Sequence, residues 1–460
     1  MGTPPRATAK SATDRLHDEC SLFLDHMEQG FGIRAEQSSS CPEAGGKYVT
    51  IDGVPNLDFT RLDYLGLGSD PVVKQHMRDA VAEYDVSCTA AQVVFKPGVI
   101  RELEEKIAQW HGLNHSLIFT SGFAANANVI QALGQRMTTP HMLAYTRAGR
   151  ILPKADRVPT IFFADRRCHY SILTPIRLCR KSDPERCEAV QFEDLEQLEA
   201  ALAQSWDVHG GDALRVICSD TLESSSGKIY DIAALYALAE RYDALLYLDE
   251  AHAVGTIGKT GAGVAVAQLP ADCDMRRVLI MGTLTKAVGQ LGGYVACHDE
   301  RVASALRIWS LQYVGSAPIP TWMAAALLKI VDHIQGPEGA RRRTALRQLT
   351  QSLCVGLHAH GFSVVCEDSH IVSIRMGAES RCLAIKERLT LLGHHVAAFV
   401  YPSTPKGGSM LRVSICSDLT EADLADLVAA LAAAAADVDA NSPAPLPVAC
   451  GHEAPAAGSF

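Results

Sequence analysis

The sequence lacks several features that mark common classes of protein. Its 14 cysteines include no Cys-x-x-Cys pair, which argues against a zinc site and against a disulfide framework. Acidic residues outnumber basic ones, 52 to 42, so no broad nucleic-acid surface is expected. Neither a run of ~18 apolar residues nor a secretory signal occurs, so we expect a soluble cytoplasmic protein without a membrane span.

What the sequence does contain is an alternation of short apolar runs with segments of helical periodicity. The apolar runs lie at 116–122, 159–165, 215–220, 244–250, 277–287 and 292–299. Strands that alternate with helices predict a mainly parallel sheet that is covered on both faces. In such sheets, ligands bind just beyond the C-terminal ends of the strands.

The pattern changes after about residue 331, where a helical stretch and later strands predict a smaller α+β domain. A last helix is predicted to begin at Thr420, where Thr-Glu-Ala-Asp makes a capping box. The three arginines at 341–343 are predicted to lie on a solvated helix face. We expect four parts: an N-terminal segment 1–80, a large domain 81–330, a C-terminal domain 331–440 and a mobile tail 441–460.

Asp249 ends one of the apolar runs, and His252 follows three residues later. A carboxylate at the end of a buried strand is costly unless it meets a cation. The protonated ring nitrogen of pyridoxal 5'-phosphate (PLP) is one such cation, and His252 can donate to the phenolic oxygen of the same ring. The alternative is a strand-end aspartate beside a structural histidine.

Lys286 follows a second apolar run, within a stretch that is rich in glycine. A partly desolvated lysine has a lowered pKa and can form a Schiff base. Thr283, three residues earlier, can bind a phosphate. The alternative is an ordinary lysine in a loop.

Two further candidates follow predicted strands. Gly122 and Phe123 lie where a strand meets a helix, so the free N–H groups of the helix can hold the cofactor phosphate. His169 follows the run 159–165 and can stack on the pyridine ring. A plain strand-to-helix turn and a structural histidine are the alternatives.

Four segments in order give the chain its family resemblance: 63–71, 121–130, 248–263 and 282–296. Together they resemble the α-oxoamine synthases, a family of PLP enzymes that includes 5-aminolevulinate synthase, 8-amino-7-oxononanoate synthase, 2-amino-3-ketobutyrate CoA ligase, serine palmitoyltransferase and autoinducer synthases. The resemblance implies the type I aminotransferase fold, with a large sheet domain and a smaller C-terminal domain.

The resemblance also assigns roles to residues that match the family motifs. Lys286 matches the lysine that binds the cofactor covalently, Asp249 the partner of the ring nitrogen, and His252 the donor to the phenolic oxygen. His169 matches the histidine that stacks on the ring and that can polarise the acyl carbonyl. Thr283 matches a phosphate ligand.

Four more residues match family positions outside these motifs. Ser224 matches a serine beside the cofactor, Arg412 the arginine that grips the substrate carboxylate, and Thr404 a threonine that contacts substrate. Ser316 matches a residue that reaches the phosphate in the neighbouring subunit, which implies a homodimer with shared active sites.

The sequence also departs from the family pattern. Leu62 stands where the family often has asparagine, and Asp220 stands where many members have glutamate. The segment 86–98 replaces a glycine-rich stretch. These departures favour the autoinducer-synthase branch or an antibiotic-pathway relative. The long segment 135–158 carries several basic residues, which suit a lid, a surface for coenzyme A or an acyl carrier protein, a solvated loop or a dimer contact.

The implied reaction is a decarboxylative Claisen-type condensation of an amino acid with an acyl thioester, which gives an α-aminoketone, carbon dioxide and free thiol. One alternative is another PLP enzyme of the same fold, an aminotransferase or a β-hydroxy-amino-acid aldolase. A second alternative, which ranks lower because Lys286 is present, is a non-catalytic partner subunit.

Overall fold

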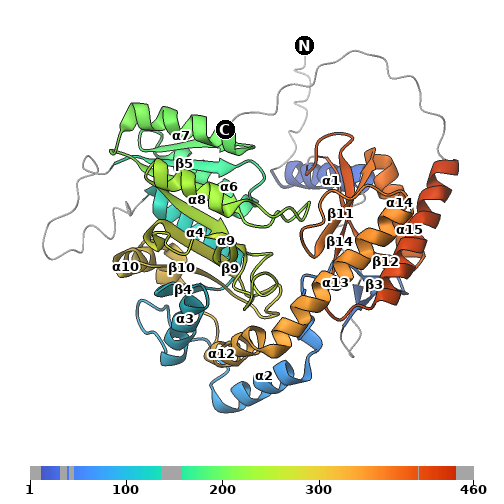
Figure 1. Cartoon of the computed structure of the whole chain (residues 1–460), viewed down its shortest axis with the longest axis horizontal. Coiled ribbons are helices and arrows are strands. Elements are labelled where there is room, and N and C mark those ends of the chain that lie inside the picture. Colours follow the sequence, from blue (N-terminus) through green and yellow to red (C-terminus); the bar gives the residue numbers. More distant parts are fainter. Residues whose placement is uncertain (1–11, 32–38, 41–45, 136–157, 402, 442–460) are drawn as a thin grey trace, which may run out of the picture.

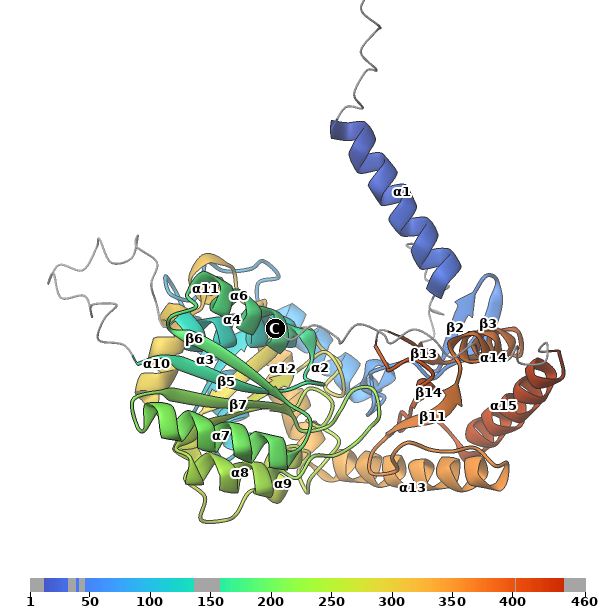
Figure 2. The same ribbon diagram turned by 90° about the horizontal axis from the view of Figure 1, so that it is seen from above.

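The computed structural model describes residues 12–31, 39–40, 46–135, 158–401 and 403–441. Figures 1 and 2 show a large body built around one sheet and a smaller C-terminal body beside it. The long helix α13 (Pro337–Ala359) runs from one body to the other (Figure 2). The predicted segment 135–158 lies almost entirely outside the described residues.

A seven-stranded sheet forms the centre of the large body, in the order β4-β10-β9-β8-β7-β5-β6. Its strands are β4 (His115–Phe119), β5 (Thr160–Asp165), β6 (Cys187–Phe192), β7 (Leu214–Asp220), β8 (Ala244–Asp249), β9 (Val278–Thr283) and β10 (Gly293–Cys297). Six of the strands run in one direction, and β10 runs in the opposite direction between β4 and β9. The predicted mainly parallel sheet is therefore confirmed. Sequence reasoning missed β6, a half-exposed edge strand in which polar residues interrupt the apolar run.

Helices cover both faces of this sheet because alternate residues of each strand point to opposite sides. Leu117 and Phe119 pack into one apolar cluster, whereas Ile118 between them belongs to another. The first face is covered by α4 (Gly122–Gln135), α6 (Tyr170–Ser182) and α10 (Glu300–Trp309). The second is covered by α3 (Gly98–Trp110), α7 (Leu195–His209), α8 (Ile232–Arg241) and α12 (Thr321–Gln335).

The C-terminal body contains a three-stranded antiparallel sheet in the order β11-β14-β13. Its elements after α13 are β11 (Ile371–Gly377), α14 (Glu379–Leu391), β12 (His394–His395), β13 (Ala397–Phe399), β14 (Ser409–Ser414) and α15 (Glu421–Asn441). The predicted capping box is confirmed, because Asp423 N–H donates to Thr420 Oγ1 at 3.2 Å and Thr420 N–H donates to Asp423 Oδ2 at 2.7 Å.

The N-terminal segment joins the C-terminal body through strand pairing. Strand β3 (Val54–Asp58) pairs parallel with β12, and β2 (Tyr48–Ile51) and β1 (Ser39–Ser40) extend the same sheet. The remaining elements are α1 (Ala12–Phe31), the 3-10 turn η1 (Leu67–Ser69), α2 (Pro71–Glu83), α9 (Val264–Gln268), the 3-10 turn η3 (Met275–Arg277) and α11 (Leu311–Gly315). The domain boundaries expected from the sequence remain a proposal.

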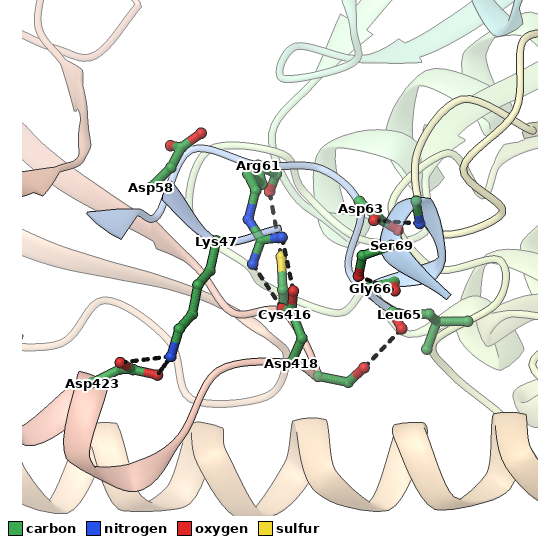
Figure 3. Close-up of polar contacts among 12 residues, drawn as sticks. Lys47, Asp58, Arg61, Asp63, Leu65, Gly66, Ser69, Cys416, Asp418 and Asp423 are labelled. Carbon is green, nitrogen blue, oxygen red and sulfur yellow. Dashed lines mark hydrogen bonds and ion pairs between the residues drawn. The ribbon is translucent and has the colours of Figure 1, made fainter. Parts of the chain in front are cut away.

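Ion pairs hold the segment 47–69 against the chain around 416–423, and we call this contact the N-terminal clamp (Figure 3). Lys47 pairs with Asp423 at 2.7 Å, and the Arg61 guanidinium reaches both carboxylate oxygens of Asp418 at 2.7 and 3.0 Å. A bidentate pair of this kind restricts the orientation of the two side chains as well as the distance between them. The clamp therefore fixes the chain that leads to Tyr64, whose carbonyl oxygen accepts from Ser417 N–H at 2.8 Å.

The prediction of a solvated face at 341–343 is wrong for two of its three arginines. Arg343 is 2% exposed and donates to the carbonyl oxygens of Ile334 at 2.8 Å and Lys259 at 2.9 Å. Arg342 is half-buried and pairs with Asp70. These arginines are buried because α13 crosses the large body and its carbonyl-rich loops, a contact that local sequence does not reveal.

Three observations on the described residues bear on the expectations from composition. Every cysteine that the structure describes is a free thiol. In the same part of the chain no cluster of three or more metal-ligating side chains occurs. Its helices are all too short or too polar to cross a membrane.

Replacing Gly227 with alanine is expected to lower the free energy of unfolding by more than about 3 kcal/mol. Gly227 has a φ of +80°, and an added Cβ would overlap the carbonyl oxygen of Ile371 in β11. The matched control is Gly361→Ala, where φ is +78° but nothing lies within 4 Å, so the backbone penalty of about 1–2 kcal/mol acts alone. Urea denaturation measures both, and equal losses would contradict the prediction.

Candidate active site

A cavity of about 210 Å³ lies at the edge of the large sheet where strands β5, β7, β8 and β9 end. The structure brings eight of the predicted site residues into its lining: Gly122, Phe123, His169, Ser224, Asp249, His252, Thr283 and Lys286. The lining also includes residues to which the sequence assigned no role: Ser121, Asn126, Ser171, Ala251, Met281 and Thr285. Asp220, noted from the sequence as a departure, lines it too.

Asp249 is held at the end of β8 by two hydrogen bonds. Its Oδ1 accepts from Ala251 N–H at 2.8 Å, and its Oδ2 accepts from Asn126 Nδ2 at 2.7 Å. Asn126 is itself fixed, because its amide donates to Ser171 Oγ at 2.9 Å and accepts from Tyr247 Oη–H at 2.8 Å. Each carboxylate oxygen of this buried acid thus has a donor, as a buried charge requires.

Asn126 is a site residue that the sequence analysis missed. A signal was available, because Asn126 lies four residues after Gly122 on the same helix, so both residues share one face. That face points to the cavity.

Lys286 follows β9, the strand next to β8, with Asp249 paired opposite Met281. Its Nζ lies 2.7 Å from His252 Nε2. Burial lowers the pKa of Lys286 to about 8, against the opposing effect of the negative charges of Asp249 and Asp220. A larger fraction of this amine is therefore neutral near neutral pH than in an exposed lysine, which makes it a nucleophile and a base.

His252 is buried and joins Lys286 to a residue from the N-terminal segment. Its Nδ1 lies 2.7 Å from Tyr64 Oη. Burial, together with the positive charge of Lys286, lowers the pKa of His252 well below its usual value. The imidazole is therefore neutral, and it carries one proton that either nitrogen can hold.

Asp220 and His169 are neighbours in the cavity lining, because His169 N–H donates to Asp220 Oδ1 at 3.4 Å. Asp220 is buried beside Asp249, and burial and that neighbouring charge raise the pKa of Asp220 well above its ordinary value. His169 lies at the N-cap of α6, with its Nδ1 2.6 Å from Ser171 Oγ. Burial lowers the pKa of His169, so a neutral ring faces the cavity.

The first turn of α4 makes an anion cradle with Thr283. Backbone N–H groups at a helix start have no partner within the helix and attract negative charge. Thr283 Oγ1 lies 2.7 Å from Thr285 Oγ1, so two hydroxyls meet at this point. A Cβ on Gly122 would lie 2.9 Å from the Thr283 Cβ, which explains why the first helical residue is glycine.

The other predicted site residues lie outside the cavity lining. Arg412 lies behind Ser224, because its Nη1 donates to the Ser224 carbonyl oxygen at 2.8 Å and its guanidinium lies 4.9 Å from the Phe399 ring centroid. Its buried Nε has no partner among the residues that the structure describes, and the same holds for the buried hydroxyl of Thr404. Ser316 is exposed on the surface. The roles of these three residues remain predictions.

Comparisons with known proteins identify the family of the chain. The sequence model for the family "Aminotransferase class I and II" matches residues 162–431. The chain is 31% identical over 397 residues to 8-amino-7-oxononanoate synthase of Herminiimonas arsenicoxydans, which covers 85% of this chain and 92% of that protein. It is also 31% identical to 4-hydroxy-2,2'-bipyrrole-5-methanol synthase PigH of Serratia sp., over 83% of this chain and 53% of that one.

Among solved structures, serine palmitoyltransferase of Sphingomonas wittichii superposes with a TM-score of 0.76 at 20% sequence identity, over 94% of this chain and 98% of that one. The fold is therefore the type I fold of PLP-dependent transferases. The chain belongs to the class I and II aminotransferase family of PLP-dependent enzymes, and within it to the α-oxoamine synthases.

The residues that line the cavity fit PLP. The cradle at Gly122 suits a phosphate, the buried carboxylate of Asp249 suits a ring cation, and the amine of Lys286 suits a covalent link to an aldehyde. His252 adds a neutral imidazole beside that amine.

Gly122→Ala is expected to weaken PLP binding at least tenfold, because the new methyl group would fill the cradle beside Thr283. The matched control is Gly98→Ala: Gly98 is the first residue of α3, and nothing lies within 4 Å of its added Cβ. Spectroscopic titration of the protein with PLP measures the effect. Equal affinities in the two variants would show that Gly122 does not face the phosphate.

Proposed function

We propose that this protein catalyses the PLP-dependent decarboxylative condensation of an amino acid with an acyl thioester, with release of carbon dioxide and free thiol. The observation that carries the proposal is the meeting of Asp249, His252 and Lys286 in one cavity at the ends of two neighbouring strands. Membership of the α-oxoamine synthases supports the acyltransferase chemistry.

When bound, PLP supplies an electron sink that stabilises a carbanion on the amino-acid substrate. In our proposal Asp249, held by Asn126, keeps the ring nitrogen protonated. His252 would donate to the phenolic oxygen, and His169 would contact the ring. Thr283, the start of α4 and Ser224 line the same cavity and would hold the rest of the cofactor.

Lys286 has two roles in this proposal. Its Nζ would hold the cofactor, and as a free amine it would move a proton at the α-carbon of the amino-acid substrate. A pKa of about 8 suits both roles, because the amine loses its proton close to physiological pH.

Arg412 is proposed to bind the substrate carboxylate, with Thr404 nearby. Burial lowers the pKa of Arg412, and its Nε has no hydrogen-bond acceptor among the described residues. A half-buried guanidinium whose buried Nε has an unused N–H is suited to bind a carboxylate, which would satisfy both the charge and the free N–H.

The test incubates the purified protein with PLP, one amino acid (glycine, alanine, serine or S-adenosylmethionine) and an acyl thioester carried on coenzyme A or on an acyl carrier protein. The proposal expects equal release of free thiol and carbon dioxide, with an aminoketone identified by mass spectrometry. Amino-group transfer or aldol cleavage without thiol release would instead indicate an aminotransferase or an aldolase.

Lys286→Ala is expected to lower turnover by ~10²–10⁴-fold or more, because it removes both the covalent anchor and the base. The visible absorption of covalently held PLP should vanish with it. The control is Lys259→Ala, at an exposed lysine outside the cavity lining, which should retain both the turnover and the visible absorption. Normal turnover in the Lys286 variant would refute the assigned role.

We also propose that the protein works as a homodimer. Phe123 lines the cavity and its ring centroid lies 5.6 Å from that of Tyr170, yet the two side chains are 48% and 62% exposed. Ser316 is exposed too, as a residue that serves a neighbouring site would be in the isolated chain. Light scattering is expected to give twice the 49.4 kDa chain mass, and a monomeric mass with full activity would exclude shared sites.

A further inference from the structure

Tyr64 is linked to the proposed catalytic lysine through a single histidine. Tyr64 Oη lies 2.7 Å from His252 Nδ1, and His252 Nε2 lies 2.7 Å from Lys286 Nζ. The Tyr64 side chain is completely buried, and its ring makes an edge contact with His370 at a centroid distance of 4.1 Å. These contacts form an unbroken chain from the N-terminal segment to the cofactor cavity.

The proton of the Tyr64 hydroxyl decides how this chain is polarised. Burial raises the pKa of Tyr64, so the phenol keeps its proton. Among the described residues, His252 Nδ1 is the acceptor within reach of that proton. A nitrogen that accepts a hydrogen bond carries no proton of its own, so the single proton of neutral His252 moves to Nε2.

We propose that Tyr64 is a positioning residue, which holds His252 in the tautomer that has its proton on Nε2 and thereby presents a hydrogen-bond donor to the cofactor cavity. The inference rests on the proposed function insofar as that donor serves PLP. It adds a residue that lies outside the cavity lining and that acts through His252.

The opposite tautomer is disfavoured by an unsatisfied donor. If Nδ1 carried the proton it would donate to Tyr64 Oη, and the Tyr64 proton would then have no acceptor among the described residues. A buried donor without an acceptor is destabilising. Among the described residues, only a protonated Lys286 would favour the opposite tautomer, because it would donate to Nε2. Covalent attachment of the cofactor to Lys286 removes this donor.

Charge on His252 does not interfere with this selection. Burial is the main cause that lowers its pKa, and the positive charges of Lys286 and Arg412, with His370 and His169, act in the same direction. The imidazole is therefore neutral on both sides of pH 7. The interaction with Tyr64 then selects a tautomer and leaves the charge unchanged.

The N-terminal clamp keeps Tyr64 in place. Its backbone N–H donates to the Leu62 carbonyl oxygen at 2.9 Å, and its own carbonyl oxygen accepts from Ser417 N–H at 2.8 Å. Figure 3 shows the ion pairs of Arg61 and Lys47 on the same segment. With both backbone groups bound and the ring packed on His370, the hydroxyl stays directed at His252.

The experiment compares the holoenzyme with Tyr64→Phe and a matched control, Tyr294→Phe. Tyr294 is also fully buried, and its hydroxyl lies 2.6 Å from His111 Nε2, outside the cavity. The first readout is the ¹⁵N spectrum of histidine-labelled protein, in which the His252 signals are those lost in His252→Gln. Tyr64→Phe should lose the pure Nε2–H tautomer, while Tyr294→Phe keeps it.

The second readout is the pH midpoint at which the absorption of bound PLP changes. A donor on Nε2 stabilises negative charge on the phenolic oxygen, which favours loss of the proton that this oxygen shares. Without Tyr64 the donor weakens, so the midpoint should rise by about one pH unit, a tenfold change in proton affinity. Tyr294→Phe should leave the midpoint unchanged.

An unchanged tautomer in Tyr64→Phe would overturn the inference, and so would an equal shift of the midpoint in both variants. Failure of the wild-type protein to bind PLP would count against the proposed function instead. In that case the ¹⁵N spectrum still decides the inference when it is recorded above the Lys286 pKa of about 8, where the lysine no longer competes.

Discussion

The site depends on the parallel pairing of β8 with β9. Neighbouring parallel strands end at the same edge of a sheet, so the residues that follow them meet there. Asp249 ends one strand and Lys286 follows the other, and the register that sets Asp249 opposite Met281 fixes their relative position. A shift of one residue would turn the Asp249 side chain to the other face of the sheet.

Burial at this edge changes the chemistry of the groups. The same loss of water that lowers the pKa of Lys286 raises the pKa of Asp220. Asp249 is instead given donors on both oxygens, from its own turn and from Asn126. Two neighbouring acids thus have different environments: Asp249 has a donor for each oxygen, whereas burial and the charge of Asp249 raise the pKa of Asp220.

The N-terminal segment also contributes a residue that contacts the site. Its strand β3 pairs with β12 of the C-terminal body, and its ion pairs with Asp418 and Asp423 hold the chain that precedes Tyr64. The hydroxyl of Tyr64 then reaches His252 in the large body. The cavity is therefore supported from both bodies, although all of its lining comes from the large one.

The sequence by itself determined six of the seven sheet strands, the order of the motifs and the residues at the strand ends. Apolar runs that stop at Asp249 and before Lys286 follow from local periodicity, and the capping box at Thr420 is equally local. Tertiary structure alone decided the contacts between distant residues. Asn126 and Asp249 are 123 positions apart, and Tyr64 and His252 are 188 apart.

Arg343 is a further residue whose contacts the local sequence did not predict. Its neighbours along the chain indicated a solvated helix face, yet the carbonyl groups that bury it come from other segments. The spacing of apolar residues along a helix or strand predicts which of its faces is apolar, because the backbone geometry of the element sets that spacing. Which partner meets a polar side chain depends on how the elements pack, and only the folded chain determines that.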